Sequence, residues 1–181
     1  MKYSKYIKIT LGIAVFAIPF VFNSCKSVKI PNDIEVVENF DIKSYAGKWY
    51  EIARFDFKYE KDMDNVTAEY SLKEDGTIKV LNKGFNTKKN EWKEKEGKAK
   101  FLSNKTKGAL KVSFFGPFYA GYNVVAMEPD YKTALVMGES KDYIWFLSRD
   151  KTMSDEVKNK FIKIASDAGY NLDRLVWTKQ N

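Results

Sequence analysis

Side chains that could act as nucleophiles, bases or metal ligands are few in this sequence of 181 residues. The sequence contains no histidine, which excludes a Ser-His-Asp triad, a histidine base and a histidine-rich metal site. Its single cysteine, Cys25, cannot form a disulfide within the chain. Carboxylates such as Glu51 and Glu69 remain, but no spacing among the acids indicates a general acid and base pair. Glycine-rich phosphate loops are absent too. We therefore expect no catalytic residue, no metal and no cofactor.

The first residues differ from everything that follows. Lys2, Lys5 and Lys8 precede an apolar run of 14 residues over 9–22. This length is typical of the hydrophobic region of a signal peptide, about 7–15 residues, and falls short of the roughly 20 residues of a transmembrane helix. We predict a signal peptide over residues 1–24, and an uncleaved membrane helix is the alternative.

Cys25 stands directly after this segment. The run Phe22-Asn23-Ser24-Cys25 resembles the lipobox read by lipoprotein signal peptidase, with Phe22 in place of the usual leucine and Asn23 in place of a smaller residue. The resemblance predicts that Cys25 is the lipidated mature N-terminus. At about 0.8 kcal/mol per buried methylene, its acyl chains would hold the protein on a membrane. Ordinary secretory cleavage near Ser24 would instead leave Cys25 as a free thiol.

The rest of the chain has the composition of one globular domain, with 44% hydrophobic and 15% aromatic residues. We expect residues 25–39 to form a polar tether and residues 40–181 to form the folded domain. The net charge is +7, and loss of the three lysines in the signal peptide leaves 28 basic against 24 acidic residues, or +4. These lysines are scattered and form no basic stripe with aromatic partners, so we expect no nucleic-acid partner.

Short runs of β-branched and aromatic residues recur from Gly47 onward and predict eight strands. The turns between them fall at Lys61-Asp62, Glu74-Asp75-Gly76, Lys88-Lys89-Asn90, Asn104-Lys105, Gly116-Pro117, Glu128-Pro129-Asp130 and Ser140-Lys141-Asp142. Eight antiparallel strands joined by hairpins can close into a barrel that has no exposed edge and holds one small ligand. A sandwich filled with side chains is the alternative.

Two of these segments alternate between apolar and polar residues, which predicts one dry, inward face. In the first, the alternate positions that would point to the same face of a strand are Val66, Ala68, Tyr70 and Leu72. In the second, Leu110, Val112 and Phe114 oppose Lys111 and Ser113.

One segment has helical periodicity instead. Val157, Phe161, Ile164, Ala165 and Ala168 recur at helical spacing, Thr152 to Asp155 resembles a capping box, and Gly169 is placed to end the helix. We expect one amphipathic helix packed outside the barrel. A short final strand follows at residues 173–178.

Three separated segments of the chain resemble, in order, the conserved stretches of lipocalins. They are Tyr45-Ala46-Gly47-Lys48-Trp49-Tyr50-Glu51-Ile52-Ala53-Arg54, Val124-Val125-Ala126-Met127-Glu128-Pro129-Asp130-Tyr131 and Trp145-Phe146-Leu147-Ser148-Arg149. The chain most resembles the bacterial outer-membrane lipoprotein lipocalins, which combine a lipobox with this barrel. The resemblance implies an eight-stranded antiparallel up-and-down barrel with one C-terminal helix outside it.

The resemblance also implies structural roles for five residues. Trp49 would plug the closed end of the barrel, and Arg149 would lie across its ring, an interaction of about 0.5–2 kcal/mol. Gly47 belongs to the same motif as Trp49. Asp130 and Tyr131 would form a turn at the same end.

Ligand contacts must come from inward positions nearer the open end, where the family supplies no fixed motif. We select Val80, Leu110, Val112, Phe114, Tyr122, Val124 and Trp145 because a site for acyl chains is mostly apolar with a few polar anchors. Tyr122 with Asn123 could orient a headgroup at the mouth.

The family resemblance implies a lipid-anchored protein of the cell envelope, located at the outer membrane. We expect it to bind fatty acids, lysophospholipids or similar apolar molecules for storage, transfer or salvage, as a monomer or a homodimer. A lipid-modifying enzyme, or a scaffold whose barrel is filled, are the alternatives.

Overall fold

A computed structural model describes residues 27–181, so the predicted signal peptide over 1–24 and Cys25 lie outside the described residues. Residues 27–41 contain no helix or strand, but they are not detached from the domain. The Val37 amide donates to the Val124 carbonyl, the Gly108 amide donates to the Val37 carbonyl, and Phe40 is buried. Among the described residues, no helix is long and apolar enough to cross a bilayer.

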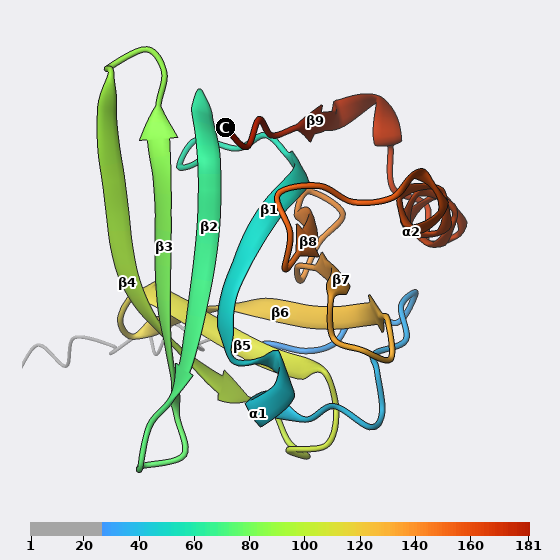
Figure 1. Ribbon diagram of the computed structural model, residues 1–181. Coiled ribbons are helices and arrows are strands. Elements are labelled where there is room, and N and C mark those ends of the chain that lie inside the picture. The colour runs from blue at the N-terminus through green and yellow to red at the C-terminus, as the bar shows by residue number, and fades with distance from the viewer. Residues whose placement is uncertain (1–26) are drawn as a thin grey trace, which may run out of the picture.

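Eight antiparallel strands form the wall of a closed barrel (Figure 1). They are β1 (Gly47–Phe55), β2 (Met63–Leu72), β3 (Ile78–Asn86), β4 (Glu91–Phe101), β5 (Ala109–Phe115), β6 (Phe118–Met127), β7 (Thr133–Met137) and β8 (Ile144–Ser148). Each strand pairs with the next, and β1 pairs with both β2 and β8, which closes the sheet. All seven turns predicted from the sequence lie between consecutive strands. The predicted fold is therefore confirmed.

The predicted inward parity is wrong in one detail. Leu72 is the last residue of β2 and is 44% exposed, because the β2–β3 hairpin extends past the closed end of the barrel (Figure 1). Ser113 keeps its predicted parity, because it pairs with Lys98 while its neighbours Val112 and Phe114 pack against the interior core, although it is only 7% exposed. A β-bulge between Val112 and Phe115 shifts the register with β6.

The predicted amphipathic helix is α2 (Asp155–Asp167), which packs on the outside of the barrel (Figure 1). Ser154 caps it by accepting a hydrogen bond from the Val157 amide, and Gly169 follows it with a φ of +78°. The ring of Phe161 meets that of Phe146 of β8 edge-on at 5.5 Å. This contact belongs to a second core, which lies between α2 and the outer face of the wall.

The C-terminal segment completes the barrel wall where β1 and β2 separate. β1 pairs with β2 only from Gly47 to Tyr50. Beyond that point, the short helix η1 (Leu172–Arg174) leads into β9 (Leu175–Trp177), which pairs with β1. The Gln180 side-chain amide then donates to the carbonyls of Glu51 and Val66, joining β1 to β2 through the tail.

The closed end of the barrel is sealed by Trp49 beneath Arg149. The guanidinium carbon of Arg149 lies 3.9 Å from the centre of the indole, and the indole nitrogen donates to the Tyr45 carbonyl at 2.8 Å. Arg149 also donates to the carbonyls of Ser44, Tyr45, Ala46, Lys48 and Tyr131. It thereby satisfies the carbonyls left open around α1 (Ile42–Tyr45), a short helix capped by Asp41 that the sequence analysis did not predict.

The other motif residues lie beside this seal. Gly47 has a φ of +94°, and an added Cβ would lie 3.4 Å from Arg149 Nη1. Asp130 accepts from the Lys132 amide within the β6–β7 turn. Tyr131 has a left-handed φ of 57°, and its hydroxyl accepts from the Asp41 amide at 2.9 Å. The β6–β7 turn is thus tied to the segment that leads into α1.

We predict that Arg149→Ala lowers the free energy of unfolding by about 2–4 kcal/mol, because it removes the stacked cation and leaves several carbonyls without a donor. Urea denaturation of the purified chain measures this. Arg174→Ala is the matched control, since Arg174 also stacks on a ring, that of Phe55 at 4.9 Å, but lies at the outer surface. Arg174→Ala should lower the free energy of unfolding by less than about 1 kcal/mol. Equal effects of the two substitutions would contradict a special role for the seal.

Candidate ligand-binding site

The seven residues predicted to contact a ligand all belong to the interior core of the barrel or pack against it. Val80, Leu110 and Val124 are buried members of this core. Val112, Phe114, Tyr122 and Trp145 are only partly buried.

The interior is filled at the closed end and accessible higher up. Val112 pairs with Ala120 across β5 and β6 and with Ala99 across β4 and β5, so the three side chains share the inner face. Ala99 is buried, Val112 is partly buried and Ala120 is exposed. An acyl chain could therefore contact the upper inner wall without displacing the floor.

Three tyrosines fill the space above Trp49. The Tyr122 hydroxyl lies 2.5 Å from the Tyr45 hydroxyl and 2.8 Å from the Tyr70 hydroxyl. Burial raises the pKa of each of these phenols above its ordinary value. The cluster is uncharged and closes the apolar interior from below.

The expectation that Tyr122 and Asn123 orient a headgroup at the mouth is wrong. The Tyr122 hydroxyl is bound within the tyrosine cluster, and Asn123 faces the other side of the sheet. The Asn123 amide donates to the carbonyls of Met137 and Gly138. Successive residues of a strand point to opposite faces, so these two could not both face a ligand.

A charged cluster lies on the inner wall near the mouth. Arg54 Nη1 lies 2.7 Å from Glu51 Oε1, and both side chains are almost completely buried. The Thr178 hydroxyl accepts from Arg54 at 3.0 Å and donates to Glu51 at 2.7 Å. Burial raises the pKa of Glu51 despite the neighbouring guanidinium. Oε1 of Glu51 accepts from both partners, which makes this oxygen a poor candidate for a general base.

Glu60, in the loop between β1 and β2, extends this cluster towards the mouth. The Trp145 indole donates to Glu60 Oε2 at 3.1 Å, and Arg54 Nη2 donates to the Glu60 carbonyl at 2.7 Å. Burial of its carboxyl, together with the nearby Glu51 carboxylate, raises the pKa of Glu60 to about 8. This acid is therefore largely protonated at neutral pH.

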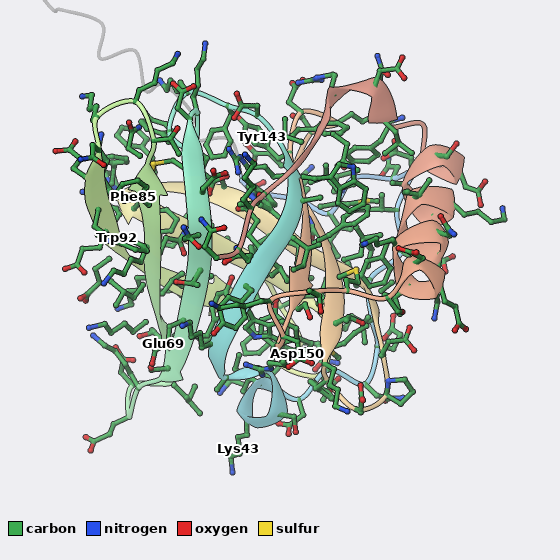
Figure 2. All side chains as sticks on the ribbon, turned by 45° about the horizontal axis from the view of Figure 1, so that its top comes forward. Lys43, Glu69, Phe85, Trp92, Tyr143 and Asp150 are labelled. Atoms are coloured by element: carbon green, nitrogen blue, oxygen red, sulfur yellow. The ribbon has the colours of Figure 1, made fainter. Side chains whose placement is uncertain are left out.

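Aromatic side chains from three loops or strand ends meet at the mouth. Phe57 contacts the rings of Tyr59, Tyr143 and Trp145 edge-on. The ring of Tyr59 also contacts that of Phe115. Figure 2 shows Tyr143 at the mouth, opposite Lys43 and Asp150 at the closed end. The accessible part of the interior thus has an aromatic rim.

Two hollows of 380 and 410 Å³ lie at the surface of the protein. The first lies beside the C-terminal tail and includes Trp92 and Gln180. The second includes Phe114, the one predicted ligand contact found in either of these two hollows, together with Lys79 and Lys98. Both linings carry several lysines, unlike the apolar inner wall.

We did not predict the roles of Arg54, Glu60 and Thr178 from the sequence. Arg54 stood within the first quoted motif, and a charged residue inside an otherwise inward apolar pattern was the available signal. Thr178 is 127 positions from Glu51 in the chain, and no local pattern could have paired them. Among residues 27–181, no group of three or more acidic or cysteine side chains is arranged to hold a metal ion.

Comparison with known proteins agrees with this architecture. The sequence model of the Lipocalin-like domain family matches residues 40–180. Solved structures with the same fold include the cockroach allergen Per a 4 (TM-score 0.66, 20% identity, 86% of this chain and 96% of that one). Insecticyanin from the tobacco hornworm Manduca sexta is another (TM-score 0.66, 20% identity, 84% and 86%).

Curated relatives are more similar in sequence. Outer membrane lipoprotein Blc of Citrobacter freundii is 49% identical, and that of Escherichia coli K12 is 47% identical. Both alignments span 93% of this chain and 95% of the relative. Temperature-induced lipocalin-1 of Arabidopsis thaliana is 34% identical, and the alignment spans 82% of this chain and 84% of that relative. With its closed barrel, sealed floor and outer helix, this chain belongs to the lipocalin family.

Proposed function

We propose that this protein is a lipid-binding lipocalin of the cell envelope, anchored to the outer membrane through an acylated Cys25. It would bind fatty acids, lysophospholipids or similar acyl lipids for storage, transfer or salvage, as a monomer or a homodimer. The observation that carries the proposal is the accessible apolar inner wall, at Val112 and Ala120, above a floor closed by Trp49.

The energetics support this function without a cofactor. An acyl chain that leaves water for a preformed apolar wall gains about 25 cal/mol for each Å² of apolar surface buried. The two relatives named as outer membrane lipoproteins support the envelope location. Glu51 is bound to Arg54 and Thr178, which favours binding over catalysis.

We predict that Val112→Asp weakens the binding of a fluorescent fatty acid about tenfold or more, because it places a carboxylate against the acyl chain. Fluorescence titration of the purified protein measures this. Lys111→Asp is the matched control: it adds the same carboxylate to the neighbouring residue, whose side chain faces outward, and should leave binding near the wild-type value. Wild-type protein that binds no acyl probe at all would support a filled scaffold instead.

We predict that Cys25→Ser releases the protein from the membrane into the soluble fraction, because the variant cannot receive the acyl anchor. Cell fractionation with immunoblotting follows the distribution. Ser27→Ala, two residues away, should remain with the membrane. Continued membrane association of Cys25→Ser would point to an uncleaved N-terminal helix.

A further inference from the structure

One buried hydrogen-bond donor on the inner wall has no acceptor in the part of the chain that the structure describes. Arg54 is 2% exposed, and both of its terminal nitrogens are bonded. Its Nε is buried, however, and within residues 27–181 it has no hydrogen-bond partner. A buried donor without an acceptor costs roughly 1–3 kcal/mol, so this position favours any oxygen atom that can reach it.

The direction of this donor follows from the strand pairing. Arg54 pairs with Trp145, which pairs with Val136, and Val136 pairs with Val124. The last two belong to the interior core of the barrel, so Arg54 faces the interior. Glu60 Oε2 lies 4.0 Å from Arg54 Nε, beyond hydrogen-bond distance.

The charges around Arg54 decide what kind of oxygen can bind there. Three acids surround this one guanidinium: Glu51 at 2.7 Å, Asp56 at 3.2 Å and Glu60 at 4.0 Å. Glu51 and Asp56 already more than balance its charge. Another buried negative charge would be repelled and would also lose its hydration. The site therefore favours an uncharged acceptor.

We propose that Arg54 Nε and the Glu60 carboxyl form a polar anchor on the inner wall that binds an oxygen of an uncharged acyl lipid, such as the ester carbonyl of a monoacylglycerol. This proposal rests on the proposed lipid-binding function and specifies the headgroup. The acyl chain would lie along the wall at Val112 and Ala120. Arg54 would donate one hydrogen bond to the lipid oxygen and the protonated Glu60 would donate a second.

Glu60 gives the anchor a dependence on pH. The charged and titratable groups around its carboxyl are Glu51 and Arg54 of β1, Asp56 of its own loop, and Tyr70 of β2. The Trp145 indole is its neutral donor. With its pKa raised to about 8, Glu60 carries a proton at pH 7 and loses it as the pH rises through 8. The ionised carboxylate cannot donate to a lipid oxygen.

Titration of the purified protein with monolauroylglycerol and with laurate, between pH 6.5 and 9.5, tests the anchor. Monolauroylglycerol has no titratable group in this range, so a change in its affinity reports on the protein. We expect its affinity for the wild type to fall about fivefold to tenfold across the range. At pH 7, laurate should bind about tenfold more weakly than monolauroylglycerol.

Glu60→Gln is the decisive variant, because glutamine keeps the size and a hydrogen-bond donor but cannot ionise. Its affinity for monolauroylglycerol should be the same across the pH range. Glu139→Gln, in the exposed loop between β7 and β8, is the matched control and should keep the wild-type response. Circular dichroism checks that all variants are folded.

The possible results separate the two proposals. If both lipids bind wild-type protein equally at pH 7, or if Glu60→Gln keeps the loss of affinity at high pH, lipid binding stands and the anchor is refuted. The same holds if wild-type affinity for monolauroylglycerol does not change with pH. If neither lipid binds any variant, the lipid-binding function itself is refuted.

Discussion

A sheet that closes on itself must seal one end before it can hold a ligand, and in this protein one stacked pair provides that seal. Arg149 lies over the Trp49 indole at 3.9 Å and donates to carbonyls of α1 and of the residues around it. The interaction combines a cation over an aromatic face with a planar set of donors, which lysine could not reproduce. The tyrosine cluster and the lower interior core are built on this floor.

Above the floor, the interior is not uniformly apolar. The buried ion pair of Arg54 and Glu51 lies where the barrel is least regular, because β1 leaves β2 there and the C-terminal tail fills the gap. Burying two charges costs hydration energy, and the pair is tolerable only because Thr178, Asp56 and backbone carbonyls complete its hydrogen bonds. The same arrangement leaves the buried Nε of Arg54 without a hydrogen-bond partner among residues 27–181.

This protein thus has two surfaces for apolar groups, and they serve different purposes. The core between α2 and the outer wall contains fully buried residues such as Leu135, Phe146 and Phe161, and it stabilises the fold. The inner wall changes from buried at Ala99 to exposed at Ala120 along a single row of paired residues. The second surface keeps an exposed apolar position at Ala120, and the rings of Phe57 and Tyr59 contact each other at the mouth.

The seven turns and the outer helix could be predicted from the sequence because each depends on a local pattern, such as turn residues or helical spacing. The closed barrel, the family and the roles of Trp49 and Arg149 followed from the resemblance of three motifs. Which side chains meet inside the barrel depends on the tertiary structure. A bulge shifts the register of β5 and β6 after Val112, and closure of the barrel sets Thr178 against Glu51. Such contacts join residues far apart in the chain, and they arise only when the strands have closed in one register.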